Sequence, residues 1–177
     1  MRYTPLIAVP LIVLSLAGCA AVQQEPPVAT VAVEEQPVFA SEEEALAAAQ
    51  AAYTQYLAVS DQIARDGGAN PERLEGLVSK ALFIDEQSGF TEISKSGLHA
   101  IGSSYVDTLH LQKNGSGKVN TYLCVDRTQI RLFDDSGVDA TSTSRIDRYP
   151  LEVSFTAKLG GGLLVESSDT WSGQNFC

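Results

Sequence analysis

Cysteine is the residue type with the clearest chemical potential in this sequence, and it occurs three times. Cys19 ends an uncharged apolar run, LIVLSLAGCA at residues 11–20, whereas Cys124 and Cys177 follow far downstream. A thiol can be alkylated, oxidised or bound to a metal, and its surroundings decide among these reactions. Cys19 stands apart from the other two cysteines, at the end of an apolar segment, so its role must be sought in the residues next to it.

The segment before Cys19 has the layout of a secretory signal peptide. Arg2 supplies a charged start, and the stretch from Leu6 to Ala17 carries no charge. This stretch is too short to cross a bilayer as a helix, which needs roughly 20 apolar residues. The sequence therefore predicts that residues 1–18 are a signal for export.

Leu16-Ala17-Gly18-Cys19 resembles the lipobox of bacterial lipoproteins, in which small residues precede a cysteine. The resemblance implies that diacylglycerol alkylates the Cys19 thiol and that the mature chain begins there. Two acyl chains are enough for stable anchoring. We therefore expect a lipid-anchored protein on the outer face of the cell membrane. The alternative is that Cys19 is one more small residue of an uncleaved or differently cleaved segment.

The charge of the chain limits its partners. The 177 residues include 22 acidic and 12 basic side chains, for a formal net charge of -10. Nucleic acid and anionic lipid headgroups are repelled by such a protein. We expect no nucleic-acid partner, and we expect membrane association to depend on the lipid on Cys19.

Residues 19–40 are predicted to be the lipidated N-terminus and a tether. They are rich in proline and glutamate, and they show no helix or strand period. Proline favours extended backbone, so the segment should act as a semi-rigid spacer. A short edge strand through Val28, Val31 and Val33 is the alternative. The remaining residues, 41–177, suit one domain with a single core.

The domain is predicted to begin with a long amphipathic helix. Ser41 and Glu44 form a capping box, in which Ser41 accepts from the Glu44 amide and the Glu44 side chain reaches back to the amide of Ser41. Gly67-Gly68 is a typical C-terminal cap. The predicted buried face of the helix includes Tyr53 and Tyr56.

Two shorter helices are expected next. Asn70-Pro71 has the residue types of an N-cap and first helical position, and the buried side chains would be those of Leu74, Leu77 and Val78. From residue 81 to residue 96 the apolar period is weaker, and it predicts a short helix broken near Gly89.

Beyond Gly97 the apolar period changes to two, which is typical of strands. The turns are predicted at residues 113–118, 134–137 and 160–162. Helices followed by a meander of antiparallel strands predict an α+β domain with the helices packed on one face of the sheet.

This order of elements resembles the NTF2-like (SnoaL-like) superfamily, and it is similar to small NTF2-like surface lipoproteins of actinobacteria. Cystatin-like neighbours of that fold would give a similar pattern. The resemblance implies a curved antiparallel sheet that N-terminal helices close on one side, which leaves a conical pocket.

Asp107 is the carboxylate that departs from its surroundings. It shares strand parity with Leu109 and Leu111, so it would point into the core if alternation were continuous. Burial raises the pKa of a carboxyl group, which is how NTF2-like isomerases set up a general base. The alternative is a place at the sheet rim, bonded to a helix end or to Arg127 or Arg131.

Two functions follow from these patterns. The favoured one is a non-catalytic domain that binds a small molecule or a protein, with no catalytic residue, cofactor or metal. The alternative is an isomerase or dehydratase that uses Asp107, and a pocket lined by Tyr53, Tyr56 and Asp107 would favour it. His99 and His110 have no Cys or Glu at ligand spacing and do not indicate a metal site.

Cys124 and Cys177 are predicted to form a disulfide. An even pair of cysteines in an exported domain is most simply bonded, although two free thiols are the alternative. Cys124 shares parity with Asn120 and Tyr122, opposite to the more apolar positions of its strand. The C-terminal tail must therefore cross the less apolar face of the sheet, or the strand must contain a bulge.

Overall fold

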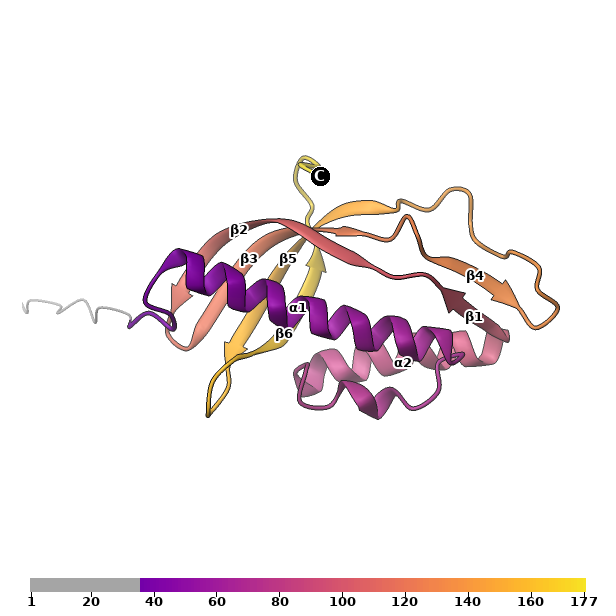
Figure 1. Ribbon diagram of the computed structural model, residues 1–177, viewed down its shortest axis with the longest axis horizontal. Coiled ribbons are helices and arrows are strands. Elements are labelled where there is room, and N and C mark those ends of the chain that lie inside the picture. The colour runs from indigo at the N-terminus through magenta and orange to yellow at the C-terminus, as the bar shows by residue number, and fades with distance from the viewer. Residues whose placement is uncertain (1–35) are drawn as a thin grey trace, which may run out of the picture. The chain divides into compact units, whose positions relative to one another are not determined.

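The computed structural model of the protein describes residues 36–177. The predicted signal peptide, the predicted lipobox with Cys19 and the alternative strand through Val28, Val31 and Val33 lie outside the described residues. Within residues 36–177 the protein is an α+β domain, as expected, with two helices packed on one face of an antiparallel sheet (Figure 1). No helix in this range combines the length and apolar character needed to cross a membrane.

The main sheet has four antiparallel strands in the order β2-β3-β5-β6. Their bounds are Tyr105–Gly115 for β2, Lys118–Asp126 for β3, Arg148–Ala157 for β5 and Leu163–Thr170 for β6. A separate two-stranded ribbon joins β1, Leu98–Ile101, to β4, Arg131–Asp134. We call the face of the main sheet that packs against the helices the inner face, and the opposite one the outer face.

Helix α1 spans Glu42–Arg65, close to its predicted bounds. Ser41 Oγ accepts from the Glu44 amide at 3.1 Å. The Glu44 carboxylate accepts from the amide of Ala40 at 3.2 Å, one residue earlier than expected. At the other end, Gly68 has a φ of 82°, and its amide donates to the carbonyl of Ile63. The buried face of α1 includes Tyr53 and Tyr56, and it packs against the inner face of the sheet.

The two shorter helices differ from prediction. The first is one 3-10 turn, Pro71–Leu74, because the chain turns away at Gly76, which has a φ of 77°. The second, α2, is longer than expected and spans Lys80–Ser96 without a break at Gly89. A single glycine costs a helix about 1 kcal/mol, and packing of the apolar face of α2 on the core outweighs that cost.

Asp107 does not point into the core, because β2 contains a bulge. The register of β2 on β3 shifts between Asp107 and His110, and Thr108 has a φ of 52°. A bulge reverses the alternation of side chains. Val106 before the bulge and Leu109 after it therefore both pack on the core, and Asp107 faces outward.

The last residues of the predicted tether belong to the domain. The side-chain oxygen of Asn114 accepts from the amides of Val38 at 3.0 Å and Phe39 at 3.1 Å. The Asn114 amide group donates in return to the carbonyl of Phe39 at 2.8 Å. Val38 and Phe39 also pack on the core. The boundary expected at residue 40 is thus too late, and the chain enters the domain beside the β2–β3 hairpin.

The C-terminal tail lies across the outer face, and Cys124 is joined to Cys177 by a disulfide. β3 pairs with β5 without irregularity, so the tail crosses the less apolar face and β3 needs no bulge. Aromatic rings hold the tail in place: Trp171 lies 4.6 Å from Tyr122 between ring centroids, and Phe176 lies 5.8 Å from His110.

Candidate functional site

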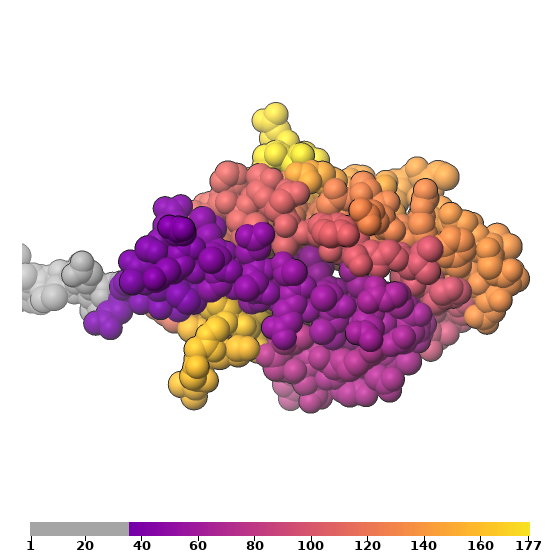
Figure 2. Space-filling view, viewed as in Figure 1, coloured from indigo at the N-terminus to yellow at the C-terminus, as the bar shows by residue number. Residues whose placement is uncertain are grey.

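A pocket of about 390 Å³ lies between α1, α2, the β1–β4 ribbon and the loops that flank β4. Figure 2 shows the surface open between α1 and the segment that leads into β2. Its volume is in the range of small-molecule sites. The apolar part of the lining consists of Ala64, Phe90, Ile93, Ala100, Ile130 and Leu132.

Three carboxylates stand on the helical walls of the pocket: Asp61 on α1, and Asp85 and Glu86 on α2. Asp61 is 9% exposed, and it accepts from the amide of Ser104 at 2.6 Å and from its hydroxyl at 2.8 Å. These two bonds tie the C-terminal half of α1 to the segment before β2. One oxygen of Glu86 accepts from the Tyr56 hydroxyl at 2.7 Å.

Tyr53 and Tyr56 do not line this pocket, because they lie behind its wall in the core. Their rings meet edge to face at 5.3 Å, and the Tyr53 hydroxyl bonds to Ser168 at 2.7 Å. Burial raises the pKa of both phenols, and the Glu86 carboxylate raises that of Tyr56 further. Both hydroxyls therefore stay protonated at neutral pH.

Asp107 is on the outer face and is not among the residues lining the pocket. Arg148 donates to both of its oxygens at 2.8 Å, and Arg148 also donates to the carbonyl of Cys177 at 3.0 Å. The bonds from Arg148 and, secondly, from Thr108 lower the pKa of the Asp107 carboxyl. The expected pocket of Tyr53, Tyr56 and Asp107 is thus not formed, since the sheet separates the two tyrosines from the carboxylate. Asp107 pairs with Arg148, whereas the alternative interpretation of the sequence named a helix end, Arg127 or Arg131 as its partner.

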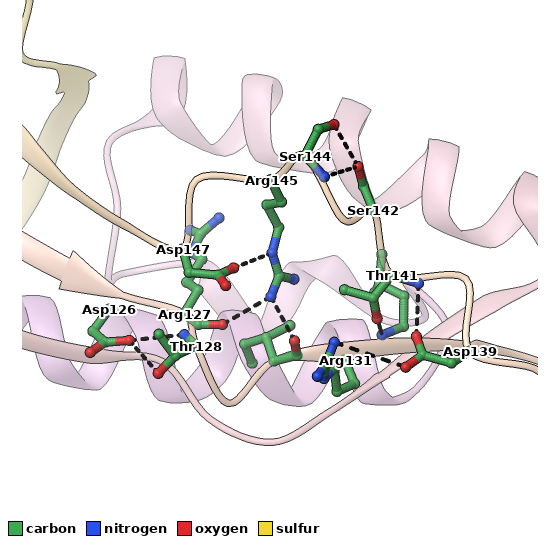
Figure 3. Close-up of polar contacts among 12 residues, drawn as sticks. Asp126, Arg127, Thr128, Arg131, Asp139, Thr141, Ser142, Ser144, Arg145 and Asp147 are labelled. Atoms are coloured by element: carbon green, nitrogen blue, oxygen red, sulfur yellow. Dashed lines mark hydrogen bonds and ion pairs between the residues drawn. The ribbon is translucent and has the colours of Figure 1, made fainter.

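The loop between β4 and β5 contributes Arg145 to the lining of the pocket. The Arg145 guanidinium donates to the Asp147 carboxylate and to the backbone carbonyls of Arg127 at 3.2 Å and Ile130 at 2.8 Å (Figure 3). The amide of Arg127 donates in turn to the carbonyl of Asp147 at 2.7 Å. Arg145 therefore fixes the backbone at Arg127, and its own guanidinium is held by three hydrogen bonds.

Arg127 also lines the pocket, but its side chain is engaged differently. Its guanidinium lies over the ring of Tyr149, with Cζ 5.9 Å from the centroid. Its Nε is buried and has no hydrogen-bond partner among residues 36–177. A buried polar group without a partner is costly, and native structures contain few of them.

Gly89 is an unusual residue for the wall of this pocket. It lies inside α2 on the pocket wall, and a Cβ added there would meet nothing within 4 Å. Gly68 is different, because it has a positive φ and a Cβ would clash with the carbonyl of Phe90. Packing explains Gly68 but not Gly89, whose missing side chain leaves the pocket wider.

Replacing Gly89 with alanine is expected to stabilise the domain by about 0.5–1 kcal/mol, because alanine is the better helix former and the site has room. Denaturant unfolding measures the change. Gly68→Ala is the matched control, and it should destabilise the domain. A loss of stability in Gly89→Ala would show that a tight contact, not the pocket, requires the glycine.

Sequence reasoning did not assign Asp61, Glu86, Gly89 or Arg127 to a pocket. A signal existed for Asp61, since Leu57 and Ala64 place it within the apolar face of a helix, where a carboxylate needs a partner. Gly89 was noticed as a helix breaker and not as part of a wall. Arg127 follows β3 in a loop, and no periodic pattern marks it.

No protein-family model and no curated protein matches this chain. Among solved structures, the intermembrane space region of chloroplast protein ARC6 is 14% identical over 71% of this chain and 97% of that chain, with a TM-score of 0.48. Aln2 from a Streptomyces species is 11% identical over 68% of this chain and 88% of that chain, with a TM-score of 0.40. These likenesses assign the chain to no family.

Proposed function

We propose that this protein is a lipid-anchored binding domain at the outer face of the cell membrane, which holds a small amphipathic molecule in the pocket between α1 and α2 without transforming it. The observation that carries the binding function is the pocket of about 390 Å³, with its apolar lining and its polar groups from both helices. Gly89 supports it, because a helix glycine without a packing reason is explained by the space that it leaves.

The alternative, an isomerase or dehydratase that uses Asp107, is less well supported. A general base for that chemistry needs a carboxylate inside the pocket, with a pKa raised toward neutrality. Asp107 lies on the outer face, and Arg148 lowers the pKa of its carboxyl. Binding without chemistry therefore fits the arrangement better.

We also propose that the fold is a variant of the NTF2-like arrangement. Two helices on the inner face of a four-stranded antiparallel sheet support this proposal, and so does a pocket beside them. The cystatin-like arrangement also places a helix on an antiparallel sheet, but a second helix that lines a pocket favours the NTF2-like one.

The domain is suited to an N-terminal anchor. The chain enters beside the β2–β3 hairpin, next to the first turn of α1, whereas Asp61 in the pocket wall lies near the end of the helix. Ala45 and Asp61 are separated by about 24 Å of helix at 1.5 Å per residue. An anchor attached through the entry segment would therefore leave the pocket at the far end of α1.

The anchor is tested by replacing Cys19 with serine. We expect the wild-type protein to partition with detergent and membranes and the Cys19→Ser variant to be uncleaved or freely soluble, because serine has no thiol for diacylglycerol. Ser15→Ala, within the apolar run but outside the lipobox, is the control and should behave as wild type. Processing before residue 19 and detergent partitioning of Cys19→Ser would exclude the lipobox.

Binding is tested by filling the pocket. Native mass spectrometry of protein purified from its own membranes should reveal a small bound molecule in the wild type and none in Gly89→Leu, whose added side chain enters the pocket. Ser88→Leu adds the same group at an exposed neighbouring position and should keep the molecule. A molecule that remains bound to Gly89→Leu would place the site elsewhere.

A further inference from the structure

We propose that Arg127 is the residue that recognises the ligand, and that the ligand is an amphipathic molecule with one carboxylate. This inference rests on the proposed binding function and names the chemical class that the pocket accepts. It follows from the position of Arg127, from its lack of a partner and from the charges around it.

Arg127 is held in place before any ligand binds. Its amide donates to the carbonyl of Asp147, and its carbonyl accepts from Arg145, so the backbone is fixed on both sides. The ring of Tyr149 supports the guanidinium. A charged group that is already oriented loses little conformational entropy on binding. These contacts hold the group in place, and none of them supplies a hydrogen-bond acceptor to its side chain.

The Arg127 side chain lacks a hydrogen-bond acceptor among the described residues. Figure 3 shows the contrast between two arginine side chains: the Arg145 guanidinium donates to one carboxylate and two carbonyls, whereas no dashed line reaches the Arg127 guanidinium. Nε of Arg127 is buried without a partner among the described residues. The fork of a guanidinium matches two oxygens of one planar group, and a carboxylate supplies both.

The other lining groups disfavour a ligand with more than one negative charge. Asp61, Asp85 and Glu86 line the same pocket, so they would repel a dianion such as a phosphate monoester more strongly than a monocarboxylate. Asp61 is occupied by Ser104, and Glu86 accepts from Tyr56. The apolar side chains, among them Phe90, Ile93 and Leu132, would cover the hydrocarbon part of the ligand.

Three probes with one chain and different head groups test this inference: octanoate, octanol and octylamine, titrated into the mature domain by isothermal titration calorimetry. We expect octanoate to bind at least tenfold more tightly than the other two. Arg127→Met should remove that preference and leave octanol binding unchanged. Arg127→Lys should keep part of it, because a lysine retains the charge but not the fork.

Arg131→Met is the matched control. Arg131 is an arginine on β4 that is not among the residues lining the pocket and that pairs with Asp139 at 4.0 Å. Its removal should leave all three affinities unchanged. Arg127→Met should also melt at the same temperature as the unliganded wild type or higher, since a buried group without a partner is removed. A structural role would lower the melting temperature and spare the preference for octanoate.

The outcomes separate the two proposals. Equal binding of octanoate and octanol, both blocked by Gly89→Leu, overturns the role of Arg127 and leaves the binding function intact. If octylamine binds more tightly than octanoate, the role of Arg127 is also overturned, and the acidic residues of the pocket are the groups that recognise the ligand. Failure of all three probes also overturns the carboxylate inference, and the bound molecule sought by native mass spectrometry then decides the binding function independently.

Discussion

The double variant Cys124→Ala/Cys177→Ser is expected to lose about 4 kcal/mol of unfolding free energy. The disulfide closes a loop with a sequence separation of 53 residues. In the chain-entropy model, restricting a loop of this length in the unfolded chain stabilises the folded state by about 4 kcal/mol. The loop contains β4, β5 and β6, so the bond constrains half of the main sheet. Urea unfolding of the wild type and the variant under non-reducing conditions measures the difference.

Reduction provides the matched experiment, because it breaks the bond without changing the sequence. The reduced wild type should unfold at nearly the same urea concentration as the double variant. Phe176→Ala keeps the disulfide and removes one ring from the tail, so it should cost much less. Equal stability of the oxidised and reduced wild type would show that tail contacts, and not the covalent bond, hold the C-terminus.

The elements that the sequence predicts well are those with strong local signals. Ser41 begins α1 where the capping box places it, and the glycines after residue 65 end it. The β2–β3 hairpin turns at Ser116-Gly117, which have φ values of 54° and 73°, as a two-residue turn of type I′ requires. These features depend on a few neighbouring residues, so a single sequence contains the information.

The errors arise where a tertiary contact outweighs a local pattern. Alternation places Asp107 in the core, but the bulge at Thr108 reverses the face. Such a bulge is stabilised by what surrounds it, including the pairing of Asp107 with Arg148 across the sheet. Gly89 suggests a break in the helix, but α2 is continuous there because its apolar face packs on the core.

The pocket was harder to predict than the fold, because its residues come from separate elements. Asp61 and Glu86 belong to different helices, and Arg127 and Arg145 come from loops on either side of β4. Their proximity is a result of the tertiary structure, and no spacing in the sequence encodes it. The disulfide was easier to predict, because the expectation of export and an even number of remaining cysteines restrict the choice to one pair.

Asp61→Ala is expected to lower the free energy of unfolding by about 2–3 kcal/mol. Asp61 is 9% exposed and accepts two hydrogen bonds from Ser104. Hydrogen bonds to a charged group contribute about 1.5–3 kcal/mol, and losing the acceptor leaves the Ser104 amide without a partner in a partly buried place. The better helix propensity of alanine recovers only a few tenths of a kcal/mol.

A double-mutant cycle separates the contact from other effects of removing Asp61. Ser104→Ala removes the hydroxyl but leaves the amide bond to Asp61, so it should cost about 1 kcal/mol. Asp61→Ala/Ser104→Ala should cost less than the sum of the single changes, because the hydroxyl bond is lost only once. Ser60→Ala, at the neighbouring pocket position, should change stability by less than about 0.5 kcal/mol. Additive costs would mean that Asp61 acts through something other than the Ser104 hydroxyl. Because this contact ties the end of α1 to the segment before β2, its loss should also weaken octanoate binding while Arg127 is unchanged.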